Sequence, residues 1–409
     1  MKPIQLIILP FLFLPFYSHC QNLPSLLTQR NIQSTFSITA YDPEAREWGI
    51  AVATDNIYVG SSTIYIEPGV GAFSVIAETE PRYGIEGLER LKQGESITQI
   101  LNSIRQQDNE AKYRQVAAID AKGNTAAFTG TALRYWDGHA GHLAGKNHIV
   151  IGNQLADSVL VAMSYTFMQE QGTLAERLLA ALLAGQAAGG QITGKQSAAL
   201  TVKGVDNEWF NQIDLRVDNA EQPFAELQQL LNYHYGRIRL NQSFYALRAG
   251  NSKRAIDKLK EGEQLLTGWY GIYDRLAMAH YQNNQTERAV ELIQTALIND
   301  ANWKNRLPAF YFLRSHPTIK LLINPADFSL QDWQNALQVL LNLERNTEAI
   351  RLGTQLIKQQ IESSYLYYLI AKAHDGNGNQ AAALKYVNLA LKIDDKNIKA
   401  EELKTKLTQ

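Results

Sequence analysis

Thr35-Phe36-Ser37-Ile38-Thr39-Ala40-Tyr41, then Asp42-Pro43-Glu44, then Trp48-Gly49-Ile50-Ala51-Val52-Ala53-Thr54 is the stretch that decides the fold of the first half of this chain. Residues 35–41 alternate in polarity, and residues 48–54 are rich in apolar side chains, as β-strands are. Asp42-Pro43-Glu44 favours a turn between them. The stretch therefore predicts an antiparallel β-hairpin.

Further strands and helices follow this hairpin. Pro81 begins a helix in which Ile85, Leu88 and Leu91 share one face, and similar apolar spacing predicts helices over 96–106, 156–170 and 174–183. Strands are predicted at residues 64–66, 71–77, 114–119, 125–128, 148–152, 197–202 and 213–217. This order predicts an α+β domain in which helices lie outside layered sheets.

A helical repeat replaces the strand pattern from about Tyr233 onward. Ala255 and Ala289 are 34 residues apart, as are Ala349 and Ala383, and this is the period of tetratricopeptide (TPR) repeats. Tyr273, Leu276, Ala277, Ala289 and Ala296 recur 94 residues later as Tyr367, Ile370, Ala371, Ala383 and Ala390. The spacing from Ala289 to Ala349 breaks the period, so we expect an irregular insertion at about 301–330, a segment that contains Pro308, Pro317 and Pro325. The predicted domains are residues 35–233 and an all-α repeat domain over 234–409.

Composition excludes several classes of protein. Hydrophobic residues make up 45% of the 409-residue chain and charged residues 19%, with a formal net charge of −1. These values exclude a disordered chain and a strongly basic nucleic-acid-binding protein, so no nucleic-acid partner is expected. The chain has one cysteine, which excludes an intrachain disulfide framework and a multi-cysteine zinc site.

The N-terminal residues are typical of a secretory signal peptide. Lys2 precedes an apolar run at residues 4–17 that is too short to span a bilayer. Small residues at Ser18 and Cys20 favour a cut after Cys20, which makes residues 1–20 the signal peptide and 21–34 a leader. The alternative is lipidation at Cys20. We expect an exported protein, periplasmic or secreted, without an integral membrane segment after processing.

Two other motifs resemble binding sites. His139, His142 and His148 stand among glycines with no standard ligand spacing, so a solvated loop is favoured over a metal site, and neither a metal nor a cofactor is expected. Gly185-Gln186-Ala187-Ala188-Gly189-Gly190 follows a predicted helix and precedes a strand, so helix termination explains its glycines better than phosphate binding does.

A set of stretches resembles, in order, the bacterial domain-of-unknown-function family 1028 (DUF1028) over about residues 35–231. They are the hairpin sequence; Pro81-Arg82-Tyr83-Gly84; Tyr113-Arg114-Gln115-Val116; Ala127-Phe128-Thr129-Gly130; Ala140-Gly141-His142; Gly152-Asn153; Leu174 to Leu179; Gln186 to Gly190; Gln196 to Leu200; and Asp214 to Asp218. The family is grouped with the N-terminal nucleophile (Ntn) hydrolases. The resemblance therefore implies a four-layer αββα sandwich for the first domain.

The same resemblance implies a nucleophile at Thr35. In Ntn hydrolases the first residue of the mature chain attacks an amide bond, and its own α-amine is the general base, since an unperturbed amine of pKa ~7.7–8.0 is partly neutral at working pH. Relatives without a signal peptide begin Met-Thr, but here residues 21–34 precede Thr35, so activity requires a second cut between Ser34 and Thr35. Between Thr35 and Arg82 the only cation is Arg46, so the lysine of proteasome-like relatives has no counterpart.

The remaining candidate site residues are Asp55, Asn153, Tyr83 and His142. Asp55 would orient the amine, and Asn153 would be an oxyanion or substrate hydrogen-bond donor. Tyr83 and His142, from matching stretches, would bind substrate. The alternative for Thr35 is that it merely begins a strand, as β-branched residues often do.

Two functions are compatible with these features. The first is an exported Ntn-type hydrolase of amide bonds in a small or peptide-like substrate, whose repeats bind the substrate. The second is a non-catalytic envelope scaffold whose repeats bind a peptide, glycan or protein partner. Family resemblance also implies pairing of two copies through outer helices.

Overall fold

The computed structural model describes residues 34–135, 137–208 and 211–409. The predicted signal peptide, the lipidation site at Cys20 and the leader up to residue 33 lie outside the described residues. The chain forms two compact units that divide between Leu231 and Asn232. The division falls within α7 (Pro223–Arg248).

A six-stranded sheet is built around the predicted hairpin. Strands β1 (Thr35–Asp42) and β2 (Glu47–Thr54) pair antiparallel, from Thr35 opposite Thr54 to Asp42 opposite Glu47. The strand order is β10-β9-β2-β1-β8-β7. The other members are β7 (His139–Gly145), β8 (His148–Leu155), β9 (Ser197–Gly204) and β10 (Ile213–Val217).

A second, four-stranded sheet packs against the first. Its order is β3-β4-β5-β6, with β3 (Ile64–Glu67), β4 (Gly71–Ala77), β5 (Arg114–Asp120) and β6 (Thr125–Thr129). Val52, Ile151 and Ala199 of the first sheet form one buried cluster with Ile76 and Ala117 of the second. The inner faces of the two sheets therefore share a core.

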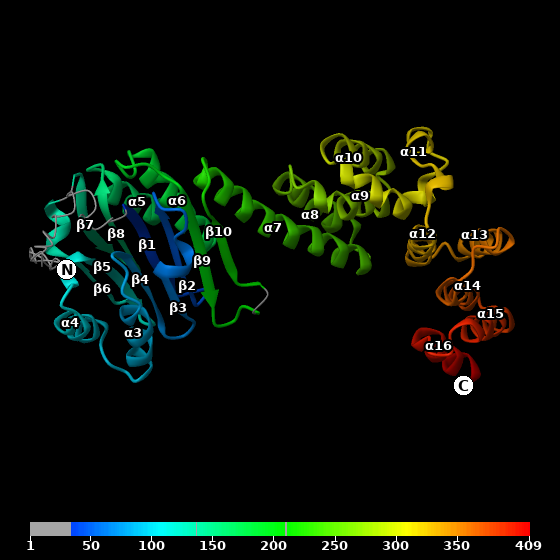
Figure 1. Ribbon diagram of the computed structural model, residues 1–409, viewed down its shortest axis with the longest axis horizontal. Helices are drawn as coiled ribbons and strands as arrows, with labels where there is room; N and C mark the ends of the chain where they lie inside the picture. The colour runs from blue at the N-terminus through cyan, green and yellow to red at the C-terminus, as the bar shows by residue number, and fades with distance from the viewer. Residues whose placement is uncertain (1–33, 136, 209–210) are drawn as a thin grey trace, which may run out of the picture. The chain divides into compact units, whose positions relative to one another are not determined.

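Helices cover both outer faces (Figure 1). Helices α3 (Arg82–Lys92) and α4 (Ile97–Gln107) pack on the four-stranded sheet, and α5 (Val159–Gln169) and α6 (Leu174–Ala187) pack on the six-stranded sheet. The first unit is therefore a four-layer αββα sandwich, which confirms the predicted fold class. Short helical segments are α2 (Gly60–Thr63), η1 (Ala111–Tyr113) and η2 (Thr131–Tyr135).

The ends of α6 follow from the sequence. Thr173 and Glu176 form a capping box that satisfies amides of the first turn. After Ala187 the chain turns through Gly189 and Gly190, which have φ of 114° and 54°. L-residues rarely adopt such angles, so this glycine pair ends the helix, as the sequence predicts.

Two local predictions are wrong. Ile85 is 59% exposed, because α3 faces the sheet through Tyr83, Gly84 and Gly87 instead. A Cβ at Gly84 would lie 2.2 Å from Cγ of Tyr65, so the helix lies too close to β3 for a larger residue there. The segment of His139 and His142 is not a loop: it is the edge strand β7, which pairs with β8. Its residues are small or exposed, so it lacks the apolar alternation that identifies a strand.

The second unit consists of TPR-like helical repeats, as predicted. Tyr273, Leu276, Ala277, Ala289 and Ala296 are buried, and so are all five of their counterparts 94 residues later. Small alanines at these positions let the helices of a pair approach closely. The helices are α8 (Ser252–Leu265), α9 (Tyr273–Gln282), α10 (Thr286–Asn299), α12 (Leu330–Asn342), α13 (Asn346–Lys358), α14 (Ser364–Gly376), α15 (Gln380–Ile393) and α16 (Ile398–Thr408).

Irregular structure interrupts the repeats between α10 and α12. This segment contains η5 (Ala301–Leu313), α11 (Pro317–Leu322) and η6 (Pro325–Asp327), and a short η4 (Tyr270–Ile272) precedes α9. Trp303 and Phe310 of η5 are buried, with ring centroids 5.8 Å apart. The segment therefore joins the core of the repeats. Among the described residues, no helix combines the length and the apolar character needed to cross a membrane.

Candidate active site

Four polar side chains form a row across neighbouring strands of the six-stranded sheet. Thr35 of β1 lies opposite Asn153 of β8 and opposite Thr54 of β2, and Thr54 lies opposite Ser197 of β9. Directly opposed residues of antiparallel strands have their side chains on the same face. The row Asn153, Thr35, Thr54 and Ser197 is therefore continuous, and all four residues are buried.

The row lies at one end of the layer between the two sheets. Ser37, two residues along β1 from Thr35, is on the same face, because side chains alternate along a strand. Its Oγ is 2.7 Å from Oγ of Ser74 in β4. Thr35 therefore faces the inner layer, whereas Phe36 faces the helices and comes close to Gly185 of α6.

The hydroxyl of Thr35 begins a short hydrogen-bonded chain. Oγ1 of Thr35 is 3.0 Å from Oγ1 of Thr54, which donates to the carbonyl oxygen of Ser34 over 2.8 Å. A carbonyl oxygen only accepts, so the single Thr54 proton is used there and Thr35 donates to Thr54. The arrangement draws the proton of Thr35 toward the carbonyl of the preceding residue.

That carbonyl, the one that joins Ser34 to Thr35, accepts three hydrogen bonds. The donors are Oγ1 of Thr54, the backbone N–H of Asp55 at 3.3 Å and Nε2 of Gln191. Three converging donors polarise a carbonyl and stabilise negative charge on its oxygen. The Ser34–Thr35 peptide group thus lies beside the Thr35 hydroxyl, whose proton is donated to Thr54.

Gln115 connects the two sheets next to this row. Its Nε2 donates to the carbonyl oxygens of Gly152, at 2.8 Å, and Gly141, at 2.9 Å, and also contacts Oγ1 of Thr129. Because carbonyl oxygens only accept, this contact set identifies the nitrogen of Gln115. Its oxygen then accepts from Nδ2 of Asn153, at 3.2 Å.

This network determines which end of Asn153 faces the site. The Nδ2 of Asn153 is used by Gln115, so the side chain presents its oxygen, which is buried and has no hydrogen-bond partner among the described residues. The sequence suggested Asn153 as an oxyanion donor. In this arrangement it offers an acceptor instead, and the donors around the Ser34 carbonyl come from Thr54, Asp55 and Gln191.

Asp55 lies directly beyond Thr54, at the end of β2. One carboxylate oxygen, Oδ1, is buried without a hydrogen-bond partner in the described parts of the chain. Burial raises the pKa of Asp55, and a hydrogen bond from Thr193 opposes that effect in part. The structure therefore brings Asp55 to the Ser34–Thr35 peptide through its backbone N–H and leaves one carboxylate oxygen, Oδ1, available.

His142 reaches the same network from the edge strand. Its Nδ1 is 3.0 Å from Oγ1 of Thr129, which also contacts Gln115. His142 is exposed, but its neighbours exclude water from part of the ring, which lowers the pKa of the imidazole. His142 is thus connected to Asn153 through two other side chains rather than placed beside Thr35.

Tyr83 does not join the site. It is fully buried between the four-stranded sheet and its helices, in the cluster of Phe73 and Ile100. Its hydroxyl donates to Asp108 at 3.3 Å, and burial together with that carboxylate raises the pKa of Tyr83. This placement gives Tyr83 a packing role and does not support the predicted substrate contact.

No group of three or more His, Cys, Asp or Glu residues that could hold a metal occurs in the described part of the chain. His148 is buried, and its two ring nitrogens contact Oγ of Ser164, at 2.8 Å, and the carbonyl oxygen of Lys146, at 3.1 Å. His139 and His142 lie on β7, whereas His148 begins β8.

Four residues of this site carried no assigned role in the sequence: Thr54, Gln115, Thr129 and Gln191. Thr54, Gln115 and Thr129 lie within stretches that resemble the family, so their positions were indicated, although polar residues in a strand do not reveal their partners. Gln191 follows the glycines that end α6, and only folding brings it to Ser34.

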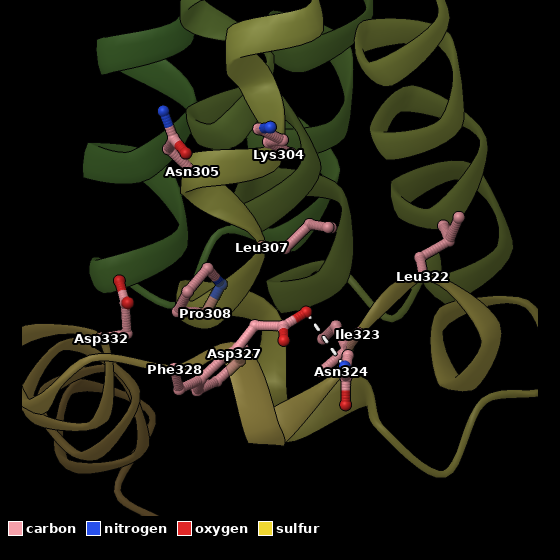
Figure 2. A pocket seen from close by; sticks show the side chains of 10 residues that line it. All are labelled: Lys304, Asn305, Leu307, Pro308, Leu322, Ile323, Asn324, Asp327, Phe328 and Asp332. Carbon is pink, nitrogen blue, oxygen red and sulfur yellow. Dashed lines mark hydrogen bonds between the residues drawn. The ribbon is translucent and has the colours of Figure 1, made fainter.

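A further cavity, of about 470 Å³, lies in the second unit (Figure 2). Lys304 and Asn305 lie toward one side of it, Asn324 and Asp327 lie toward the other, and Nδ2 of Asn324 donates to Asp327 over 3.0 Å. Its apolar lining comes from Leu307, Pro308, Leu322, Ile323 and Phe328. The insertion between the repeats thus creates a hollow with mixed polar and apolar walls.

An αββα sandwich with a threonine at the start of a central strand, followed by helical repeats, is the class of protein that these features define. The model of a family of unknown function, DUF1028, matches residues 35–227. A DUF1028 protein of Silicibacter pomeroyi with a solved structure is 35% identical, with 48% of this chain and 84% of that chain covered and a TM-score of 0.45. This chain belongs to the DUF1028 family.

Other solved structures resemble the repeats. MamA from Desulfovibrio magneticus RS-1 is 17% identical, with 42% of this chain and 83% of that chain covered and a TM-score of 0.21. The TPR domain of P58(IPK) is 15% identical, with 42% and 55% covered and a TM-score of 0.22. No curated protein sequence matches this chain.

Proposed function

We propose that this protein is an exported N-terminal nucleophile hydrolase of amide bonds, activated when the chain is cut between Ser34 and Thr35. The observation that carries the proposal is the chain of hydrogen bonds from Thr35 Oγ1 through Thr54 Oγ1 to the carbonyl oxygen of Ser34. A nucleophile, a path for its proton and a polarised carbonyl are assembled at one peptide bond.

The cut itself can be intramolecular. Oγ1 of Thr35 attacks the carbonyl carbon of Ser34 while its proton moves to Thr54, whose own proton moves to the Ser34 oxygen. The bond from that carbon to the Thr35 nitrogen then breaks, the nitrogen takes the proton, and an ester to Oγ1 remains. Water hydrolyses the ester and releases a carboxylate at Ser34 and a free amine at Thr35.

The freed amine supplies the base that the uncut chain lacks. In hydrolysis of a substrate it takes the proton of Thr35 Oγ1 during attack and delivers it to the departing nitrogen. Asn153 Oδ1 and Asp55 Oδ1, both buried and unpartnered among the described residues, are the acceptors available to orient it. No lysine is required in this scheme.

The repeats are proposed to present a peptide-like ligand. Support comes from the cavity of Figure 2 and from a second cavity, of about 390 Å³, whose lining includes Ile256, His280 and Arg288. Charged groups beside apolar walls suit a peptide, which carries both kinds of surface. Export and pairing of two copies belong to the same proposal, and cell fractionation and light scattering test them.

Intact mass and N-terminal sequencing of the purified full chain test the central claim. We expect a mature chain that begins at Thr35, the same start in Thr35→Ser, and an uncut chain in Thr35→Ala. A correctly folded wild-type protein that keeps Ser34 attached would contradict the proposal.

A second candidate function is a non-catalytic envelope scaffold that binds its partner through the repeats. The observation in its favour is that both oxygens of Ser34, the side-chain Oγ and the carbonyl oxygen, are hydrogen-bonded to the sandwich. Under this alternative, Thr35→Ala would leave partner binding and any cellular phenotype unchanged.

A further inference from the structure

The acyl group of the substrate can be inferred from Ser34, and this step rests on the proposed function. Self-cleavage and substrate hydrolysis pass through the same kind of intermediate, an ester on Oγ1 of Thr35. In the first the acyl group is Ser34; in the second it belongs to the substrate. In both intermediates the acyl carbon is bonded to the same oxygen, Oγ1 of Thr35. The groups that hold Ser34 therefore define where a substrate acyl group can lie.

The site that the Ser34 side chain occupies is small and polar. Ser34 is fully buried. Its Oγ donates to the carbonyl oxygen of Asn153 at 3.0 Å and approaches that of Gln154 at 3.5 Å, so the side chain ends against the backbone of β8. A rigid backbone cannot move aside as a flexible side chain can. A larger side chain would clash there, and an apolar one would lose the hydrogen bond.

A neighbouring side chain also offers an acceptor to a ligand. Gln191 donates from Nε2 to the Ser34 carbonyl oxygen, and its Oε1 is buried without a hydrogen-bond partner among the described residues. A buried oxygen without a partner is costly, so its occurrence on a side chain that contacts Ser34 suggests a group that a ligand satisfies. An N–H group of a peptide backbone is a suitable donor for it.

We propose that the substrate is a peptide-like amide whose acyl residue at the cleaved bond is small and donates a hydrogen bond from its side chain, as serine does. Alanine is the next best acyl residue, since it fits the site of the Ser34 side chain but cannot donate a hydrogen bond from its own side chain. Valine and phenylalanine are excluded by the β8 backbone.

Two measurements test this proposal. In the first, the self-processed wild-type chain is assayed with fluorogenic coumarin amides of N-acetyl-serine, N-acetyl-alanine, N-acetyl-valine and N-acetyl-phenylalanine, with Thr35→Ala as blank. We expect kcat/KM to fall from serine to alanine and by at least about tenfold more to valine and phenylalanine. In the second, the cleavage rates of full-chain Ser34→Ala, Ser34→Val and Ser34→Phe are compared, and the same order is expected.

The outcomes distinguish failure of the acyl-residue proposal from failure of the hydrolase proposal. Cleavage of the valine or phenylalanine amide at rates equal to or above the serine amide would overturn the acyl-residue proposal and leave the hydrolase proposal standing. The amide series uses one unmutated protein, so misfolding of a Ser34 variant cannot imitate that result. A chain that neither processes itself nor cleaves any of the four amides would overturn both proposals.

Discussion

Thr35 and Thr54 face each other across β1 and β2 with their Oγ1 atoms 3.0 Å apart, and the proton of Thr54 is committed to the carbonyl oxygen of Ser34. Two hydroxyls of the central hairpin thus form a directed chain that ends on the peptide group preceding Thr35. The burial of this chain matters, because hydrogen bonds to developing charge are stronger where water is excluded.

Two substitutions of Thr54 distinguish the effect of its hydroxyl from the effect of its size. Thr54→Val keeps the size of the side chain but removes the donor to Ser34, and we expect the cut before Thr35 to slow by about 100-fold, as loss of an oxyanion donor does. Thr54→Ser keeps the hydroxyl and should remain within a few-fold of the wild type. The time course of cleavage, followed by intact mass, gives both rates; equal rates in Thr54→Val and wild type would argue against a role for the hydroxyl chain.

Gln115 should contribute strongly to the stability of the first unit. Gln115→Leu leaves Asn153 Nδ2 and the carbonyl oxygens of Gly141 and Gly152 without that partner between the sheets. We expect a loss of about 3 kcal/mol in the free energy of unfolding, measured by urea denaturation. The matched control is Gln107→Leu at an exposed helix end, where a change within about 0.5 kcal/mol is expected. Similar values for the two variants would contradict the bridging role.

Asp55 should make the fold less stable as the pH rises. Its pKa is raised by burial, so the folded state binds the proton more tightly than the unfolded state does. Its ionisation therefore costs stability from the ordinary aspartate pKa of about 3.9 up to the higher folded value, and the cost persists at neutral pH. In the uncut Thr35→Ala chain, we expect Asp55→Asn to raise the stability at pH 7, with the gain vanishing below about pH 4.

A control and a contrary result define that test. Asp218→Asn, at an exposed position, should show no comparable gain between the two pH values. If Asp55→Asn lowers the stability of the uncut Thr35→Ala chain at pH 7, the carboxylate is held by a favourable partner rather than penalised by burial.

The repeat interpretation can be tested at Ala383. This residue is fully buried in α15, so Ala383→Leu should overpack the helix pair and lower the free energy of unfolding of the second unit by about 1–3 kcal/mol. Ala381→Leu, two residues earlier on the same helix and exposed, should change it by less than about 0.5 kcal/mol. Urea denaturation followed by tryptophan fluorescence measures both, and a tolerated leucine at position 383 would contradict close helix contact there.

Much of the fold was predictable because its strands and helices produce periodic patterns of apolar residues along the sequence. Alternation and a turn placed β1 and β2, and buried alanines at the TPR period placed the helices of the repeats. The edge strand β7 was missed because its small, exposed residues carry no such signal; its pairing with β8 supplies the structure that its composition does not. Ile85 was assigned to the wrong face because two glycines, Gly84 and Gly87, lie beside Tyr83 on the buried face of α3, and glycines give no apolar signal in the sequence.

By itself, the sequence determined the order of the strands and helices apart from β7, the place of the repeats and the candidacy of Thr35, since all of these depend on neighbours along the chain or on ordered family motifs. Only the tertiary structure decided which groups hold Ser34 and Thr35. Gln191 and Asn153 are each more than 100 residues away from Ser34 along the chain, and their contacts arise from strand register and from the turn after α6. Hydrogen bonds depend on distance and direction in space, which local sequence patterns do not encode.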